Sequence, residues 1–156
     1  MTKLTTGEAT MNKYFEEDYQ KKIALEKAYD EAETEESKDA IIEKVQCLVK
    51  AINAKEKSYR RLFAAYLDMR ERENEHLDFG RDVIWQRDIP EIVASLKENG
   101  IKAFTLSARN TDAIEIAAGF EKAGCHLIGL TEINGYFPSI VNNAYEKIPA
   151  LLFSIA

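Results

Sequence analysis

Nine positions between residues 41 and 69 repeat at alternating spacings of four and three residues, and eight of the nine are apolar. A stripe of this kind is typical of a helix that packs along another helix with a left-handed crossing. The exception is Lys55, whose apolar stem can lie along the stripe while its ammonium group reaches water. The nine positions are Ile41, Val45, Leu48, Ile52, Lys55, Tyr59, Leu62, Tyr66 and Met69.

The segment upstream of the stripe supplies a second helix to pack against it. Four apolar residues there follow one another four positions apart, which places them on one helical face. They are Met11, Phe15, Tyr19 and Ile23. Farther along, Thr34 and Ser37 are both suited to cap the next helix. We therefore predict an antiparallel, coiled-coil-like helical hairpin, with helices over about residues 6–32 and 37–75.

The second of these helices would be roughly 55–60 Å long, since each residue adds about 1.5 Å. A globule of this chain length is expected to be narrower than that. Part of the helix should therefore project from the domain or pair with another chain. On its stripe we expect Tyr59, Leu62, Tyr66 and Met69 to contact a protein partner or a second copy.

The pattern changes after residue 75, where short apolar runs alternate with helical runs. We expect two domains, a hairpin over residues 1–75 and a small α/β domain over residues 76–156. The α/β domain should contain two helices and a mixed sheet of three to four strands, which makes the fold α+β or α/β. The expected elements are a helix over 91–99, a strand over 101–108, a helix over 111–123, a strand over 125–133 and a final strand over 148–155.

The order of these elements also predicts how the strands pair. Two strands joined by a helix and short links favour a parallel neighbouring pair with a right-handed connection. The final strand can fold back antiparallel, and its apolar residues on both faces favour a buried position. Asn134 and Gly135 predict a tight turn that ends the strand before them. Gly100 and Gly124 are placed to end the two helices.

Charge and composition exclude several function classes. The net charge of −6 argues against nonspecific binding to nucleic acid or to an anionic membrane. No window approaches the roughly 18 uncharged apolar residues of a membrane span, and the N-terminus lacks the apolar core of a secretory signal. Cys47 and Cys125 show no paired spacing, so we expect two buried thiols in a reducing cytoplasm.

The polar break after the first strand of the α/β domain is the best candidate for a ligand site. Ser107, Arg109, Asn110 and Thr111 follow that strand and precede a helix, and helix N-termini attract anions. A phosphate or carboxylate could bind there. The alternative is a tight turn with a helix cap, and it is favoured because the break contains no glycine for close backbone approach to a phosphate.

Searches for other chemistry yield little. His76 and His126 are fifty residues apart and lack metal-ligand spacing, so we expect no metal site. Cys125 and His126 would point to opposite faces of a strand and therefore cannot act as a nucleophile and its base. We assign no catalytic residue and no cofactor. Arginines interleave with aromatic residues near residues 59–72, but nearby carboxylates favour a solvated helix face over nucleic-acid binding.

Trp85, the only tryptophan, lies in the junction between the two predicted domains. We expect it to be buried there and to hold the hairpin against the α/β domain, because a buried indole removes a large apolar surface from water. The alternative is a binding hot spot for a protein partner.

The order of elements from Ile101 to Ile133, followed by a final strand, resembles the C-terminal part of acetyltransferases of the GNAT type. Asn110 and the run from Phe120 to Cys125 occupy the places of that family's asparagine and helix end. The glycine-rich acyl-CoA loop of the family is missing. The resemblance therefore implies a topology and no activity.

A second resemblance covers about residues 74–156. The strings Val83-Ile84-Trp85, Glu98-Asn99-Gly100-Ile101, Phe104-Thr105-Leu106-Ser107 and the run from Tyr145 to Ser154 are similar to a family of uncharacterised small proteins carried on mobile elements of gut bacteria. No functional residue carries over from this family. The resemblance implies a role in element maintenance, transfer or evasion of host defence.

These observations favour a non-enzymatic protein-interaction or inhibitor module that binds a protein partner, or a second copy of itself, through the hairpin. A defence complex of the host is one such partner. The alternative is a small-molecule or anion-binding protein, or a degenerate GNAT-like acyltransferase domain, using Ser107, Arg109 and Asn110.

Overall fold

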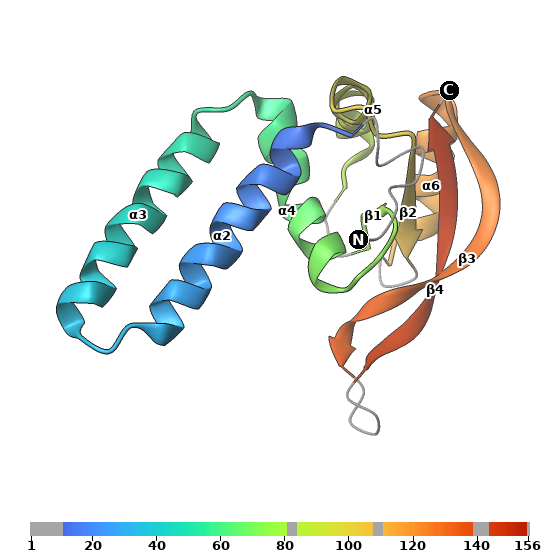
Figure 1. The fold of residues 1–156 in the computed structure, drawn as a ribbon. Coiled ribbons are helices and arrows are strands. Elements are labelled where there is room, and N and C mark those ends of the chain that lie inside the picture. Colours follow the sequence, from blue (N-terminus) through green and yellow to red (C-terminus); the bar gives the residue numbers. More distant parts are fainter. Residues whose placement is uncertain (1–10, 81–83, 108–110, 139–143, 156) are drawn as a thin grey trace.

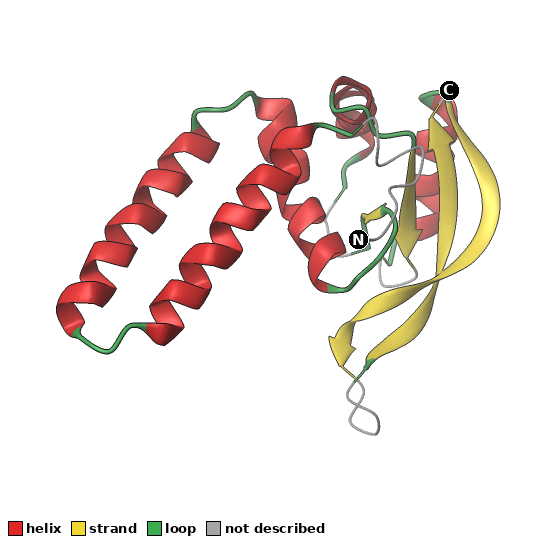
Figure 2. Ribbon diagram, in the orientation of Figure 1, coloured by secondary structure: helices red, strands yellow, loops and turns green. Residues whose placement is uncertain are grey.

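The computed structural model describes residues 11–80, 84–107, 111–138 and 144–155. Within these residues three helices precede a small α/β region with a four-stranded mixed sheet, so the fold is α+β as expected (Figures 1 and 2). The helices are α2 (Lys13–Glu31), α3 (Glu35–Asn53), α4 (Lys57–Glu71), α5 (Ile89–Glu98) and α6 (Ala113–Lys122), with a 3-10 helix η1 (Gln86–Asp88) before α5. The strands are β1 (Leu77–Asp78), β2 (Ala103–Ser107), β3 (Cys125–Pro138) and β4 (Tyr145–Ile155).

Helices α2 and α3 form the expected hairpin and extend side by side away from the sheet (Figure 1). Helix α2 begins at Lys13, later than predicted, because the side chain of Asn12 accepts a hydrogen bond from the main-chain N–H of Tyr14 at 3.0 Å and caps the helix. Thr34 caps α3 as expected, since its hydroxyl accepts from the N–H of Ser37 at 3.0 Å.

The prediction of one continuous helix over residues 37–75 is wrong. Helix α3 ends at Asn53 and α4 begins at Lys57. The helix is therefore interrupted around Lys55, the polar exception in the apolar stripe. The ammonium of Lys55 lies 3.5 Å from the Asp18 carboxylate and 4.4 Å and 4.9 Å from the ring centroids of Tyr14 and Tyr59. The stripe therefore divides between two helices. Its second half, on α4, is buried in the core, and of its first half, on α3, Ile52 packs against the core.

The strand order is β1-β2-β4-β3, with β1 parallel to β2 and both other pairs antiparallel. The predicted parallel pair of β2 and β3 is wrong, because β4 lies between them. The antiparallel return and interior position of the final strand are confirmed. Phe153 of β4 pairs with Phe104 of β2 on one side and with Leu127 of β3 on the other, so β4 is an interior strand of the sheet.

The predicted turn at Asn134 and Gly135 is also wrong, since β3 continues through both residues. Asn134 is held instead by the chain just after α4. Its N–H donates to Oδ1 of Asn74 at 2.9 Å, and its side-chain amide donates to the carbonyl of Arg72 at 2.7 Å. These long-range bonds outweigh the local preference of the pair for a turn.

One core joins α4, α5 and α6 to the sheet. Phe104, Phe120 and Phe153 are fully buried with ring centroids 4.8–5.7 Å apart. Gly100 and Gly124 follow the ends of α5 and α6 with φ of 71° and 98°, which confirms their predicted role because this region favours glycine.

The two cysteines differ in environment. Cys125 is buried as expected, and burial raises the pKa of its thiol, while nearby Lys97 acts in the opposite direction. Cys47 lies exposed on α3, so the prediction of two buried thiols is wrong for this residue. None of the helices in the described part of the chain combines the length and apolar character that a membrane span requires.

Candidate functional site

The four stripe residues that we expected to bind a partner lie on α4 and are buried within this chain. Tyr59, Leu62, Tyr66 and Met69 expose between 0% and 6% of their surface. Their apolar face is covered by the α2 side of the hairpin and by the rest of the core. They therefore form part of the core, and no surface for another protein remains on them.

Phe15 is the residue that covers much of this face. Its ring is fully buried and stacks on Tyr59, Tyr66 and Phe63, with centroid distances of 4.7, 5.2 and 6.4 Å. We call Phe15 and the residues around it, namely Asp18, Lys55, Tyr59 and Tyr66, the hairpin root. Aside from Asp18, Phe15 is the only buried residue of α2, so the helix is attached through its first turns.

Hydrogen bonds in the hairpin root add to the ring contacts. The Tyr59 hydroxyl donates to the carboxylate of Asp18 at 2.5 Å. Burial raises the pKa of Tyr59, and the Asp18 carboxylate raises it further. Asp18 itself is buried, and it is held by Tyr59 and by the ammonium of Lys55. A buried carboxylate with two such partners is satisfied and is a structural group.

Glu16 joins the hairpin root to the other end of α4. Its carboxylate accepts hydrogen bonds from Nε of Arg70 at 2.7 Å and from the hydroxyl of Tyr66. Burial alone would raise the pKa of Glu16, but the bonds from Arg70, Gln20 and Tyr66 outweigh it and hold the pKa below the ordinary value of 4.5.

This lowered pKa predicts an acid-sensitive part of the stability. The unfolded chain protonates Glu16 before the folded chain does, so the stabilisation is complete above about pH 4.5 and is lost as the pH falls through the lower folded pKa. Glu16→Gln should flatten the dependence of the free energy of unfolding on pH below this value. Denaturant titrations between about pH 7 and about pH 3 measure it. Glu17→Gln, at an exposed neighbouring position, should keep the wild-type dependence, and equal slopes for all three proteins would refute the role of Glu16.

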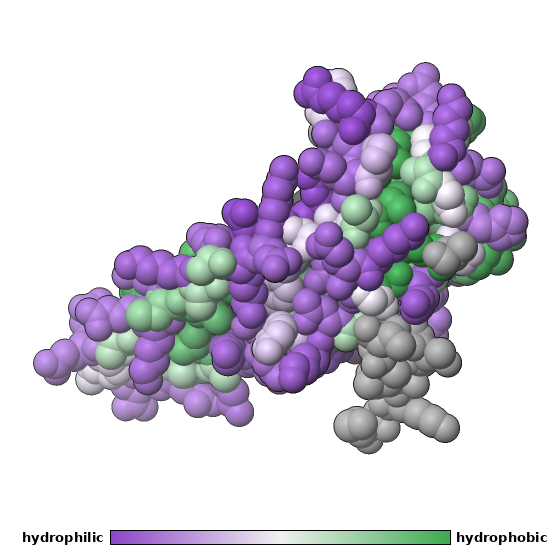
Figure 3. Space-filling view, turned by 90° about the horizontal axis from the view of Figure 1, so that it is seen from above, coloured by the Kyte–Doolittle hydropathy of each residue, from purple (hydrophilic) through white to green (hydrophobic). Residues whose placement is uncertain are grey.

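The outer part of the hairpin is different, because α3 has no buried side chain at all. Ile42, Val45 and Val49 repeat at helical spacing and expose 41%, 39% and 49% of their surface. Val45 also lines a hollow of about 380 Å³ together with Leu25 and Tyr29 of α2. Figure 3 shows hydrophobic surface on the hairpin among hydrophilic borders. We call Leu25, Tyr29, Ile42, Val45 and Val49 the outer hairpin face.

Trp85 does not hold the hairpin against the α/β region. It exposes 59% of its surface and lies just before η1, with the guanidinium of Arg87 5.8 Å from its ring. The expectation that it is buried is wrong, because Phe15 makes the attachment that we assigned to Trp85. Its role as a partner contact stays a prediction.

The predicted ligand residues after β2 are not brought together in the described part of the chain. Ser107 is fully buried at the end of β2, whereas Thr111 is exposed before α6. Arg109 and Asn110 lie outside the described residues. Asp78, at the end of the parallel neighbour β1, is close to Ser107, since a β-carbon on Gly80 would lie 1.7 Å from the Ser107 hydroxyl and 2.8 Å from Oδ2 of Asp78.

A buried polar cluster surrounds Asp78. Its carboxylate accepts from the hydroxyl of Thr105 at 2.7 Å, from the N–H of Gly80 at 3.0 Å and from the hydroxyl of Tyr136. Burial raises the pKa of Tyr136, and the charge of Asp78 raises it further. The guanidinium of Arg72 lies 3.8 Å from the centroid of the Tyr136 ring. Sequence reasoning missed this cluster, because we assigned Arg72 to a solvated helix face and expected no strand at β1.

Arg72 is the member of this cluster with spare hydrogen-bonding capacity. Its side chain is 5% exposed, and within the described ranges neither Nε nor Nη2 has a hydrogen-bond partner. Nη1 lies 3.6 Å from the Asp68 carboxylate. Two adjacent guanidinium N–H groups match the geometry of a carboxylate or a phosphate.

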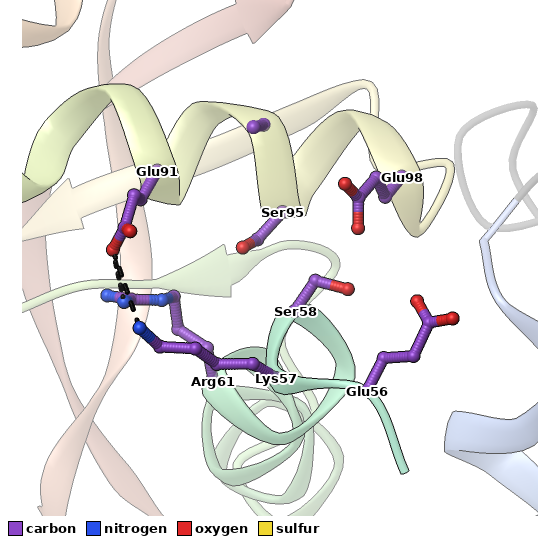
Figure 4. A pocket seen from close by; sticks show the side chains of 8 residues that line it. Glu56, Lys57, Ser58, Arg61, Glu91, Ser95 and Glu98 are labelled. Atoms are coloured by element: carbon purple, nitrogen blue, oxygen red, sulfur yellow. Dashed lines mark hydrogen bonds and ion pairs between the residues drawn. The ribbon is translucent and has the colours of Figure 1, made fainter.

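A second hollow, of about 310 Å³, lies between the N-terminal end of α4 and α5 (Figure 4). Glu91 on one side pairs with Arg61 at 3.0 Å and with Lys57 at 3.8 Å on the other. Because both basic groups that line it pair with Glu91, this hollow offers no unpaired cation to an anionic ligand, and Glu56 and Glu98 add negative charge to its lining. Among residues 11–80, 84–107, 111–138 and 144–155, no three His, Cys, Asp or Glu side chains gather closely enough to hold a metal.

Comparison with known proteins leaves the chemistry open. No curated protein and no solved structure matches the chain at a significant level. One family model does match, and it spans residues 61–155, from within α4 to the end of β4, so that α2 and α3 lie outside the match. Since this match covers more than half of the chain, the chain belongs to the family described as Domain of unknown function (DUF7698).

Proposed function

We propose that this protein is a protein-interaction module that binds its partner through the outer hairpin face. The observation that carries the proposal is α3, a helix of 19 residues without one buried side chain, whose exposed residues include Ile42, Val45 and Val49. Covering an exposed apolar stripe with a partner removes apolar surface from water, and this lowers the free energy of the complex. The hairpin that carries this stripe extends away from the sheet (Figure 1).

The attachment of the hairpin supports this proposal. Its root is fixed by Phe15 and by the bonds of Asp18 and Glu16, so the helices are anchored at one end. A rigid pair of helices that is anchored at its base can present a defined surface, and helix faces are a recurrent mode of protein recognition. Inhibition of a host defence complex is one form that this binding would take in a protein carried on a mobile element.

Site-specific photo-crosslinking in the producing cell tests the proposal. A photoreactive residue at Val49 should form covalent adducts with protein, because Val49 lies on the outer hairpin face. The same residue at Ala51 is the matched control, since Ala51 is exposed two positions later and lies on a different side of α3. Adducts from position 49 and none from position 51 support the proposal. Equal adduct formation at both positions, or none at either, contradicts it.

A second candidate function is anion binding at Arg72. The specific observation is its two buried guanidinium nitrogens without a hydrogen-bond partner in the described ranges. The guanidinium stacks on Tyr136, whose hydroxyl donates to Asp78 at the end of β1. Such strand ends are a common location of ligands in α/β sheets. Arg72 would supply the two donors to a phosphate or carboxylate group.

Thermal unfolding in inorganic phosphate tests this second function. Phosphate should raise the melting temperature of the wild type but not that of Arg72→Gln, relative to the same ionic strength of chloride. Arg60→Gln, at an exposed position on α4, should respond like the wild type. An equal response of all three proteins would show that phosphate acts without Arg72.

A further inference from the structure

The charges of α3 are divided between its two halves. Residues 35–43 contain Glu35, Glu36, Asp39 and Glu43 against one lysine, whereas residues 44–53 contain two lysines and no acidic residue. Two copies of this helix side by side in the same direction would place acidic half on acidic half. Antiparallel copies would place the acidic half of each on the basic half of the other, with opposed helix dipoles.

The apolar stripe has the same symmetry. Ile42 and Val49 are equally far from the midpoint between residues 45 and 46, so an antiparallel copy centred there places Ile42 of each chain opposite Val49 of the other. Asp39 and Lys50 are both exposed and lie on one side of the stripe, because eleven residues make about three turns. In this register Asp39 comes within about 3 Å, along the helix axis, of Lys50 of the second copy.

Asp39 and Lys50 form no ion pair with any residue in the described part of the chain. The register also brings Glu35 of one copy level with Glu56 of the other, between Lys55 and Lys57, which pair with Asp18 and Glu91 of their own chain. The charge complementarity therefore lies within α3, between Asp39 of each copy and Lys50 of the other.

From this self-complementarity we infer that the outer hairpin face binds the same face of a second copy of this chain in antiparallel orientation. This inference rests on the proposed function and names its partner. The interface is isologous, so each contact occurs twice. Helices α2 and α3 of the two copies form a four-helix arrangement, with Leu25 and Tyr29 beside the stripe and the two α/β regions at opposite ends.

Sedimentation velocity over a concentration series tests the inference with the full chain. The wild type should pass from monomer to dimer as its concentration rises. Val49→Glu should raise the dissociation constant at least about tenfold, whereas Ala51→Glu, with the same added charge, should change it less than about threefold. A wild type that stays monomeric, or equal effects of the two variants, would overturn the inference.

Charge reversal and cysteine pairing test the orientation. Asp39→Lys and Lys50→Asp should each weaken the dimer about fivefold, and the double variant should recover wild-type affinity. In a Cys47→Ser background, a mixture of Ile42→Cys and Val49→Cys chains should form mixed disulfides far faster than either chain alone. Disulfides formed mainly within each single-variant sample would contradict the antiparallel register.

The two proposals fail differently. A monomeric wild type that still gives position-specific adducts at Val49 with a different protein would overturn self-association and leave the proposed function standing. A monomeric wild type without such adducts would overturn both.

Discussion

Replacing Phe15 with alanine is expected to lower the free energy of unfolding by about 3–5 kcal/mol. The ring is fully buried and stacks on Tyr59, Phe63 and Tyr66, so its removal loses apolar burial, aromatic contacts and packing in one step. Because small domains are stable by about 5–15 kcal/mol, a loss of this size is a large part of the total. Denaturant titration followed by circular dichroism measures it.

Phe15→Leu keeps the expected effect measurable if the alanine variant does not fold. Leucine fills part of the same space and should cost less than alanine. Lys27→Ala, at an exposed position on the same helix outside the outer hairpin face, is the control and should change stability by less than about 1 kcal/mol. Hydrogen exchange should show α2 losing protection in Phe15→Ala more than β4 does. A Phe15→Ala protein as stable as Lys27→Ala would contradict the hairpin root.

Asp78→Ala is expected to lower the free energy of unfolding by about 3 kcal/mol, which is the second large effect. The substitution removes the acceptor of the Thr105 hydroxyl, the Gly80 N–H and the Tyr136 hydroxyl. Thr105 is fully buried, and its remaining acceptor is the carbonyl of Leu77 at 3.4 Å. A buried polar group that loses a partner costs about 1–3 kcal/mol, because water cannot replace the lost bond.

Two variants separate this effect from a general loss of charge. Asp78→Asn retains the shape and one acceptor oxygen, so it should cost less than the alanine variant. Glu71→Ala removes an exposed carboxylate at the end of α4, and it should have little effect. If Asp78→Ala were no more costly than Glu71→Ala, the buried cluster would not be a stabilising network.

Local patterns in the sequence predicted the elements well. The hairpin, a cap at Thr34 (one of the two expected candidates), the two helices that end at Gly100 and Gly124, and the antiparallel return of β4 onto the preceding strand β3 are all confirmed. Each of these depends on residues close together in the chain. The resemblance to an uncharacterised family is confirmed at that level by the family match.

The errors share one physical cause, which is contact between distant residues. The break at Lys55 depends on Asp18 and Tyr14, some forty residues away. The continuation of β3 through Asn134 depends on Asn74 and Arg72. A heptad stripe also does not show which of its halves will be covered, because the covering residue, Phe15, lies on another helix.

The candidate sites were predictable only in part. The expectation of exposed apolar surface rested on one helix of roughly 55–60 Å, which the structure divides at Lys55. Of the residues that stay exposed, Val45 is on the predicted stripe, whereas Ile42 and Val49 are each one position away from a stripe residue. The cluster of Arg72, Asp78 and Tyr136 depends on the pairing of β1 with β2 and on the long course of β3, and no local spacing indicates it.

The central claim is that the outer hairpin face is open in the single chain and covered by a protein in the cell. Alkylation of one cysteine, placed at position 49 or at position 51 in a Cys47→Ser background, measures this cover directly. In dilute purified protein both positions should react at similar rates. In the producing cell the account predicts that Val49→Cys reacts at least about tenfold more slowly than Ala51→Cys. Equal rates in the cell would contradict it.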